Sequence, residues 1–227
     1  MTSAVDKAYR EIRRGIVSGT YPLGAHLKAA DLAARMDMSR TPVREALRRL
    51  HAEGLIDFIA NHGAFVSSWT RDDIEELFAL RSVLESHAAE LAATRITPNQ
   101  LSEARQLVEQ MAELARTKPP EYIDRIAELN GRFHTLIVIA AASRRLAALL
   151  ASLVELLLVV RTFHSYTDQE LLRSMAHHRE LVDALAAGDG RWAASVMRGH
   201  ILFGRHAYVV SNADVIDKKT PVLQGQA

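Results

Sequence analysis

The sequence contains no cysteine, which excludes disulfide bonds and thiol chemistry. Aromatic residues make up only 6% of the chain. Long apolar runs are also missing: the longest, Leu146–Val160, spans 15 residues and includes Glu155, so it is too short for a bilayer and is typical of a buried helix. The N-terminus is polar and shows no signal-peptide pattern. We therefore expect a cytoplasmic protein with no membrane partner.

A strong net charge is missing too, but the charge is unevenly distributed. The 227 residues carry a net charge of +1. Residues 1–70 hold ten Lys and Arg against seven Asp and Glu, a net of +3, while the remainder holds 18 against 20, a net of −2. A basic excess confined to one segment is typical of a part that meets nucleic acid. The length supports one large or two modest domains.

Residues 31–54 form the most informative stretch, because their apolar pattern predicts two short helices with a tight joint between them. The first apolar set stops before Asp37–Ser39, and the second has the i, i+3, i+4, i+7 spacing of one helix face; the sets are Leu32, Ala33 and Met36, then Val43, Ala46, Leu47 and Leu50. Thr41 can cap the second helix, with Pro42 as its first helical residue, and Gly54 can end it.

The opposite face of the second helix is basic. Arg40, Arg44 and Arg48 repeat every four residues, and Ser39 and Thr41 place hydroxyl groups at the start of the helix. Guanidinium groups bind phosphate or read guanine through two hydrogen bonds, and small hydroxyls bind phosphate. These five residues therefore predict a DNA-binding face. The alternative is a basic surface that meets only water.

The segments on either side of the helix pair complete the order of a known fold. Val5–Val17 has a helical pattern, and Leu55–Ile59 and Ala64–Ser67 are strand candidates joined by a turn. Three helices followed by a hairpin is the order of a winged helix-turn-helix, whose hairpin turn, the wing, lies along the minor groove. His62 and Gly63 form its tip, where glycine permits close approach of the backbone and histidine can donate to a phosphate or a base edge.

Residues 5–69 resemble the winged-helix domain of the GntR family of bacterial transcription regulators. The resemblance rests mainly on Ser39–Leu47, which reads SRTPVREAL, together with Gly54-Leu55 and Gly63–Val66. It implies that DNA is contacted by Ser39, Arg40, Thr41, Arg44, His62 and Gly63. The chain departs from the family in the first helix of the pair, where a basic residue is common and Ala30 stands here. The preceding turn has Leu23-Gly24 in place of Pro-Gly.

From Arg71 onward the pattern is helical throughout, so the fold is mainly α and the second part is an all-α helical bundle. The predicted helices are Asp72–Thr94, Pro98–Thr117, Pro120–Ala141, Ser143–Ser165, Asp168–Ala187 and Arg191–Ser211. We expect a winged helix-turn-helix domain over residues 1–70, a helical domain over 71–212 and a polar tail over 213–227.

Seven of the ten histidines lie in the helical part, and three of them fall on apolar helix faces. His134 shares its face with Asn130, four residues earlier, and His178 and His200 each belong to an apolar stripe. A single histidine on such a face is usually structural, but three buried imidazoles all need partners. One shared metal ion would serve all three, since neutral imidazole suits zinc, nickel, copper or iron.

Residues 71–211 resemble the FCD domain, the all-helical ligand-binding domain of the FadR-type branch of the same family. The matching segments include Leu80–Glu85, Leu129–His134, His178-Arg179 and Met197–His200. The resemblance implies a divalent metal ion, with zinc or nickel as the leading candidates, held by Asn130, His134, His178 and His200. Many members have an aspartate where Asn130 stands.

Neutral metal ligands affect which effector the site would bind. They would leave the full +2 charge of the ion in place, which favours an anionic effector such as a small carboxylate or hydroxy acid. Arg81 could bind a second carboxylate through two parallel hydrogen bonds. The alternative for Arg81 is an ion pair with Glu85, one helical turn later.

Together these features predict a transcription regulator, with a repressor favoured by family habit. It would bind a pseudo-palindromic double-stranded DNA operator as a homodimer and respond to a carboxylate effector. Two alternatives stay open. The effector pocket could be free of metal, with the histidines binding the effector directly. Three histidines with an open position could also form a catalytic zinc site, although the sequence has no HExxH-type helix and Glu128 falls off the ligand face.

Overall fold

The computed structural model describes residues 3–153 and 156–216. These residues divide into two compact units, the first mainly residues 3–70 and the second mainly residues 71–216; residues 156–158 group with the first. Each unit has its own apolar core. In the first, Ile12, Ile16 and Leu50 have no exposed surface, which shows that the apolar faces predicted for the N-terminal helices are buried.

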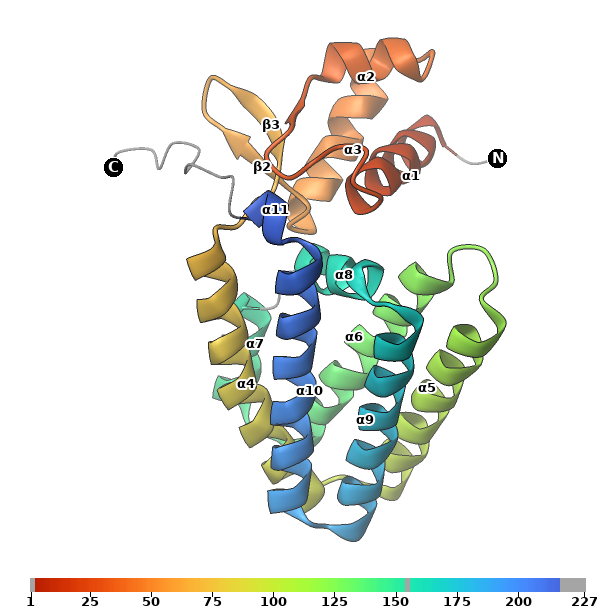
Figure 1. Ribbon diagram of the computed structural model, residues 1–227. Coiled ribbons are helices and arrows are strands. Elements are labelled where there is room, and N and C mark those ends of the chain that lie inside the picture. The colour runs from red at the N-terminus through yellow and green to blue at the C-terminus, as the bar shows by residue number, and fades with distance from the viewer. Residues whose placement is uncertain (1–2, 154–155, 217–227) are drawn as a thin grey trace. The chain divides into compact units, whose positions relative to one another are not determined.

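The first unit combines helices with a small sheet. Its helices are α1 (Ala4–Val17), α2 (Ala29–Arg35) and α3 (Arg40–Ala52), and its strands are β1 (His26–Leu27), β2 (Ile56–Ile59) and β3 (Gly63–Val66). The strands pair antiparallel in the order β1-β3-β2, and α1 packs against α3 (Figure 1). This is a winged helix-turn-helix, so the predicted fold of this part is confirmed.

Strand β1 is an element that the sequence pattern does not predict. It pairs His26 with Phe65 and Leu27 with Ala64 of β3. A strand of two residues is too short to show an alternating apolar pattern, so pairing with β3 defines it rather than its own sequence. Its consequence is that residues 26–28 lie beside the wing.

The start of α3 also differs from the prediction. Thr41 is not the N-cap: Ser39 takes that position, with φ −70° and ψ 163°, and the helix begins at Arg40. Pro42 is then the third helical residue, where its missing N–H still breaks no hydrogen bond, because the first four N–H groups of a helix have no intrahelical acceptor. Gly54 does end the helix. Its φ is +72°, and the next N–H donates to the carbonyl of Leu50 at 3.0 Å.

The second unit is the predicted all-α bundle. Its helices are α4 (Arg71–Ala93), α5 (Pro98–Thr117), α6 (Tyr122–Ala140), α7 (Arg144–Leu153), α8 (Leu156–Ser165), α9 (Asp168–Ala187), α10 (Gly190–Ser211) and α11 (Ala213–Ile216). Helix α10 lies between α4 and α9; α9 also contacts α5, which packs on α6, and α6 returns to α4 (Figure 1). The bundle is therefore closed around a common core.

The predicted helix Ser143–Ser165 is wrong, because two helices, α7 and α8, occupy this segment with a 66° change of direction. The segment contains neither Gly nor Pro, so its own sequence does not signal the bend. The bend allows α7 to pack on α4 and α6 while α8 supplies side chains to an internal cavity. Among the described helices, none alone has the length and apolar composition to cross a bilayer; α7 and α8 meet that test only as a bent pair.

Several helix ends and the predicted tail differ slightly from the prediction. Helix α6 begins at Tyr122, two residues later than predicted, and α10 begins at Gly190, one residue earlier. Residues 213–216 of the predicted polar tail form α11, with Ile216 only 3% exposed. The remaining tail residues, 217–227, lie outside the described part of the chain.

Candidate nucleic-acid interface and metal centre

Helix α3 has two opposite faces. Val43, Ala46 and Leu50 are fully buried in the first unit. The predicted DNA-binding residues of this helix all lie on the exposed side: Ser39, Arg40, Thr41, Arg44 and Arg48. Arg48 donates to Glu45 at 2.6 Å, but both side chains are about half exposed or more, and such surface pairs contribute little to stability. This guanidinium can therefore exchange its partner for a phosphate at small cost.

The wing presents its tip to solvent. His62 and Gly63 are exposed, and the N–H of His62 donates to the carbonyl of Ile59 at 3.0 Å, which closes the turn. Gly63 has φ +100°, a conformation that side chains disfavour, and a Cβ there would lie 3.0 Å from Nε2 of His26. The backbone conformation therefore favours glycine at the tip, whereas a Cβ would only press on the exposed His26 side chain.

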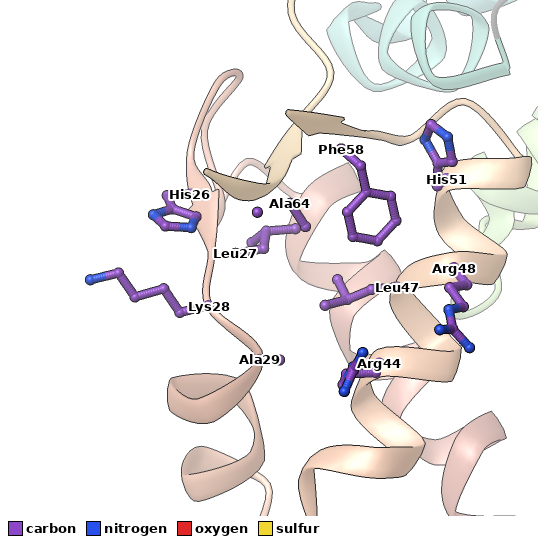
Figure 2. Close-up of a pocket in the computed structure, with 11 residues that line it drawn as sticks. His26, Leu27, Lys28, Ala29, Arg44, Leu47, Arg48, His51, Phe58 and Ala64 are labelled. Atoms are coloured by element: carbon purple, nitrogen blue, oxygen red, sulfur yellow. The ribbon is translucent and has the colours of Figure 1, made fainter. Parts of the chain in front are cut away.

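A groove of about 480 Å³ runs between α3 and the strands of the first unit. Figure 2 shows His26 and Lys28 on one side and Arg44 and Arg48 on the other. The surface between these basic side chains is apolar and comprises Leu27, Leu47, Phe58 and Ala64. Sequence reasoning did not single out His26 or Lys28, because β1, which contains His26 and ends just before Lys28, was not predicted.

In the second unit, α6, α9 and α10 bring His134, His178 and His200 together. One ring nitrogen of each lies within 4.8 Å of the others. His178 is fully buried, His200 is 6% exposed, and the His134 side chain is 12% exposed. Nitrogens bound to one tetrahedral zinc ion at 2.0–2.1 Å lie about 3.4 Å apart, so binding would need an inward movement of the rings from separations as large as 4.8 Å.

Each of these imidazoles has one buried nitrogen without a hydrogen-bond partner among the described residues: Nε2 of His134, Nδ1 of His178 and Nδ1 of His200. Buried polar atoms are rarely left unpaired, because the loss of hydration is then uncompensated. Asn130, the fourth predicted ligand, is 4% exposed, and its Oδ1 lies 2.9 Å from Nε2 of His178. This donor set fits a metal ion in its residue types, its burial and the close approach of its ring nitrogens.

A buried carboxylate, Glu85, contacts both His134 and Arg81. Glu85 lies on α4 with its Oε2 2.6 Å from Nδ1 of His134, and it accepts from Nε of Arg81 at 2.7 Å. The ion pair between Arg81 and Glu85, which was the alternative prediction for Arg81, is therefore present in the structure. Arg81 nevertheless lines the same cavity as His134 and His200. Sequence reasoning considered Glu85 only as a partner of Arg81, since its contact with His134 joins helices far apart in the chain.

Burial and charge set the protonation states here. Burial alone would raise the pKa of Glu85, but the neighbouring charges and hydrogen bonds of Arg81 and His134 outweigh it and lower that pKa to about 2. The pKa values of His178 and His200 are lowered well below the ordinary 6.5, mainly by burial and further by the adjacent imidazoles. Neutral imidazoles at neutral pH are the form that binds metals.

The cavity beside the histidines is small, about 30 Å³. Its other walls are Phe78 of α4, Val159, Thr162 and Phe163 of α8, and Tyr166. A space of this size holds an ion or a water molecule, whereas sites for organic ligands usually measure about 300 Å³ or more.

Comparison with known proteins now decides the class. The FCD domain matches residues 76–203, and the gntR family of bacterial regulatory proteins matches residues 4–66. The chain belongs to the GntR family. One relative, from Paenarthrobacter nicotinovorans, is described as the probable D-xylose utilization operon transcriptional repressor; it is 34% identical over 203 residues, which cover 88% of this chain and 86% of that protein.

Other relatives agree. The HTH-type transcriptional repressor RspR of Escherichia coli K12 is 27% identical over 195 residues, covering 85% of this chain and 83% of its own. The solved structure of E. coli McbR/YncC has a TM-score of 0.64 at 23% identity, over 94% of this chain and 99% of that chain, which shows the shared fold. GntR regulators bind DNA operators and typically dimerise, so this protein is a transcription regulator and not an enzyme. The catalytic zinc interpretation is wrong.

Proposed function

We propose that this GntR regulator is a cytoplasmic homodimer that binds a pseudo-palindromic operator and acts as a repressor, as the names of two relatives suggest for those proteins. A small carboxylate effector would control its affinity for the operator. The effector would bind at or near a divalent metal ion in the FCD domain. The domain limits proposed are residues 1–70 for the DNA-binding part and 71–212 for the effector part. The observation that carries the proposal is the approach of one ring nitrogen each of the buried His134, His178 and His200 to within 4.8 Å of one another.

For DNA, we assign α3 to the major groove and the wing to the minor groove. Arg40, Arg44 and Arg48 are exposed on one helix face, where they can reach base edges or phosphates. Ser39 and Thr41 would bind phosphate at the start of the helix. At the wing, His62 and Gly63 complete the contact set. Two such heads are needed for half-sites one helical turn, or a multiple of it, apart.

For the metal, Asn130, His134, His178 and His200 are the proposed ligands, with zinc or nickel as the leading ions. The contact with Glu85 supports this: a proton on Nδ1 of His134, donated to Glu85, leaves Nε2 with a lone pair for the ion. Oδ1 of Asn130 lies 2.9 Å from Nε2 of His178, so both atoms could face the same ion.

For the effector, Arg81 is the proposed second anchor. Its charge is balanced by Glu85, so a bound dication would keep its positive charge uncompensated and attract an anion. A cavity of about 30 Å³ is too small for a carboxylic acid. Binding would therefore move side chains that wall it, among them Val159 and Phe163 of α8. Such a movement gives the effector different contacts in two states, which a change in operator affinity requires.

The same contacts also support a metal-free pocket. The 2.9 Å contact is equally a direct hydrogen bond from Nε2 of His178 to Asn130, and the remaining ring nitrogens could then bind the effector themselves. The two possibilities differ in metal stoichiometry, which makes that the decisive quantity.

The experiment is metal analysis by mass spectrometry on protein purified without metal-affinity columns. We expect about one zinc or nickel ion per chain in the wild type and in His87→Ala, an exposed histidine of α4 that serves as the control. His134→Ala should contain none. A wild type that stays metal-free after incubation with zinc and with nickel, and dialysis, would reject the metal site and favour the metal-free pocket.

A further inference from the structure

We propose that the groove between β1 and α3 holds the sugar–phosphate backbone of one DNA strand, with His26 and Lys28 as phosphate ligands. The inference rests on the proposed DNA binding and adds residues that the helix and the wing do not include. It assigns a role to β1, the strand that only the structure reveals.

The position of β1 makes these side chains available. Leu27 points into the first unit and is 2% exposed, whereas His26 and Lys28, its neighbours on either side, are exposed. Alternate residues of an extended segment share a face, so both basic side chains point the same way. Across the groove stand Arg44 and Arg48 of α3 (Figure 2).

The chemistry of the groove matches a sugar–phosphate chain. None of the described residues that line it is acidic, and five of them are Lys, Arg or His: His26 and Lys28 on one side, and Arg44, Arg48 and His51 of α3 on the other. The surface between is apolar and includes Phe58, which is 45% exposed although it is a large aromatic residue. Phosphates can meet the basic sides while the apolar faces of deoxyribose lie over Phe58.

Lys28 is an unexpected residue for its place in the chain. It is the N-cap of α2 and makes no side-chain capping bond there. Ser, Thr, Asp and Asn are preferred at an N-cap because they accept a hydrogen bond, and a positive charge at a helix N-terminus is unfavourable. A residue that breaks a local rule in an exposed position is expected where it serves binding. It can supply the phosphate contact that Ala30, inside α2, cannot.

The geometry of double-stranded DNA explains why this groove would hold a sugar–phosphate backbone rather than a base. When one element reads the major groove and another the minor groove, the strand of backbone that separates these grooves must pass between them. Here α3 and the wing are those elements, and Gly63 of the wing tip also lines the groove.

The test uses the full-length protein and a duplex that the wild type selects from a random-sequence library. Affinity is measured by fluorescence anisotropy over a range of salt concentrations. Each phosphate contact contributes about −0.9 to the slope of log K against log salt concentration. Lys28→Ala removes one contact from each subunit of the dimer, so the slope should become less steep by about 1.8. Base preference in a repeat selection should not change. Lys28→Arg should keep the wild-type slope.

Two further variants sharpen the test. Phe58→Ala should lower the affinity without changing the slope, because it removes apolar contact and no charge. Lys118→Ala, which removes an exposed lysine from the second unit, should change neither. An unchanged slope in Lys28→Ala, or an altered base preference, would overturn the groove assignment alone. A wild type that selects no duplex would overturn it together with the proposed DNA-binding function.

Discussion

The two units of this regulator use the same residue types in opposite environments. In the first unit, the arginines proposed to bind DNA lie on the exposed face of α3, and the apolar face beneath them is complete without them. In the FCD domain, Arg81 and Glu85 are 6% and 3% exposed and lie in the core with His178 and His200. The site is on the outside of one unit and in the interior of the other.

This difference determines what each site can do. An exposed charge exchanges water or a weak partner for a phosphate at small cost, and the fold does not respond. A buried charge is held by its partners, so any ligand that changes those partners changes the packing around them. The first arrangement suits recognition, and the second suits the effector response that we propose for the FCD domain.

The largest expected effect of a substitution is at Glu85. Glu85→Gln leaves the charge of Arg81 buried without its partner and removes an acceptor from His134. Breaking a buried pair in this way costs about 3–5 kcal/mol. Urea unfolding followed by circular dichroism should show the transition of the second unit at much lower denaturant concentration.

Glu45→Gln is the matched control, since Glu45 pairs with Arg48 at 2.6 Å, close to the 2.7 Å of the buried pair, but on the surface. It should change the free energy of unfolding by less than about 1 kcal/mol. Equal effects of the two substitutions would show that burial does not distinguish the units.

The next effect concerns pH in protein freed of metal by chelation. The folded-state pKa values of His178 and His200 lie well below the unfolded value near 6.5, so below pH 6.5 the unfolded chain takes up protons that the folded chain does not. Their stabilising contribution is complete above that pH and is lost as the pH falls. For two groups the free energy of unfolding should decrease by about 2.7 kcal/mol per pH unit.

Denaturant titrations between pH 7.5 and 5.5 measure this dependence. His177, whose pKa is lowered by partial burial, adds to the loss in the same direction. Glu85 also does so, but only below its ordinary value of 4.5, outside this window. A free energy that stays constant over the range would mean that the imidazoles are not buried in the neutral form.

Metal binding should stabilise the second unit, by less than the effects predicted above, and should not stabilise the first unit. An ion that binds only the folded state at ten times its Kd raises the free energy of unfolding by about 1.4 kcal/mol through mass action. Adding zinc or nickel should therefore raise the Tm of the wild type and leave His134→Ala unchanged. An equal rise in both would indicate binding elsewhere on the chain.

The sequence predicted what local pattern determines. The periodic apolar residues located nearly every helix, and the SRTPVREAL string located the recognition helix. It did not predict β1, which exists only through pairing with β3, or the bend between α7 and α8, which has no Gly or Pro. The link from Glu85 to His134 joins positions 49 apart and follows from packing of α4 on α6. Features that depend on distant partners leave little trace in a single sequence.

The smallest effect on stability should come from the residue with the largest proposed effect on binding. The Arg44 side chain is exposed and points away from the buried face of α3, so Arg44→Ala should change the free energy of unfolding by less than about 0.5 kcal/mol. It should abolish preference for the selected duplex, because the contact with a base edge proposed for this guanidinium would be lost in each half-site. Circular dichroism and anisotropy on one preparation measure both. Lost helicity would mean that Arg44 supports the fold, and the separation of recognition from stability in this unit would then fail.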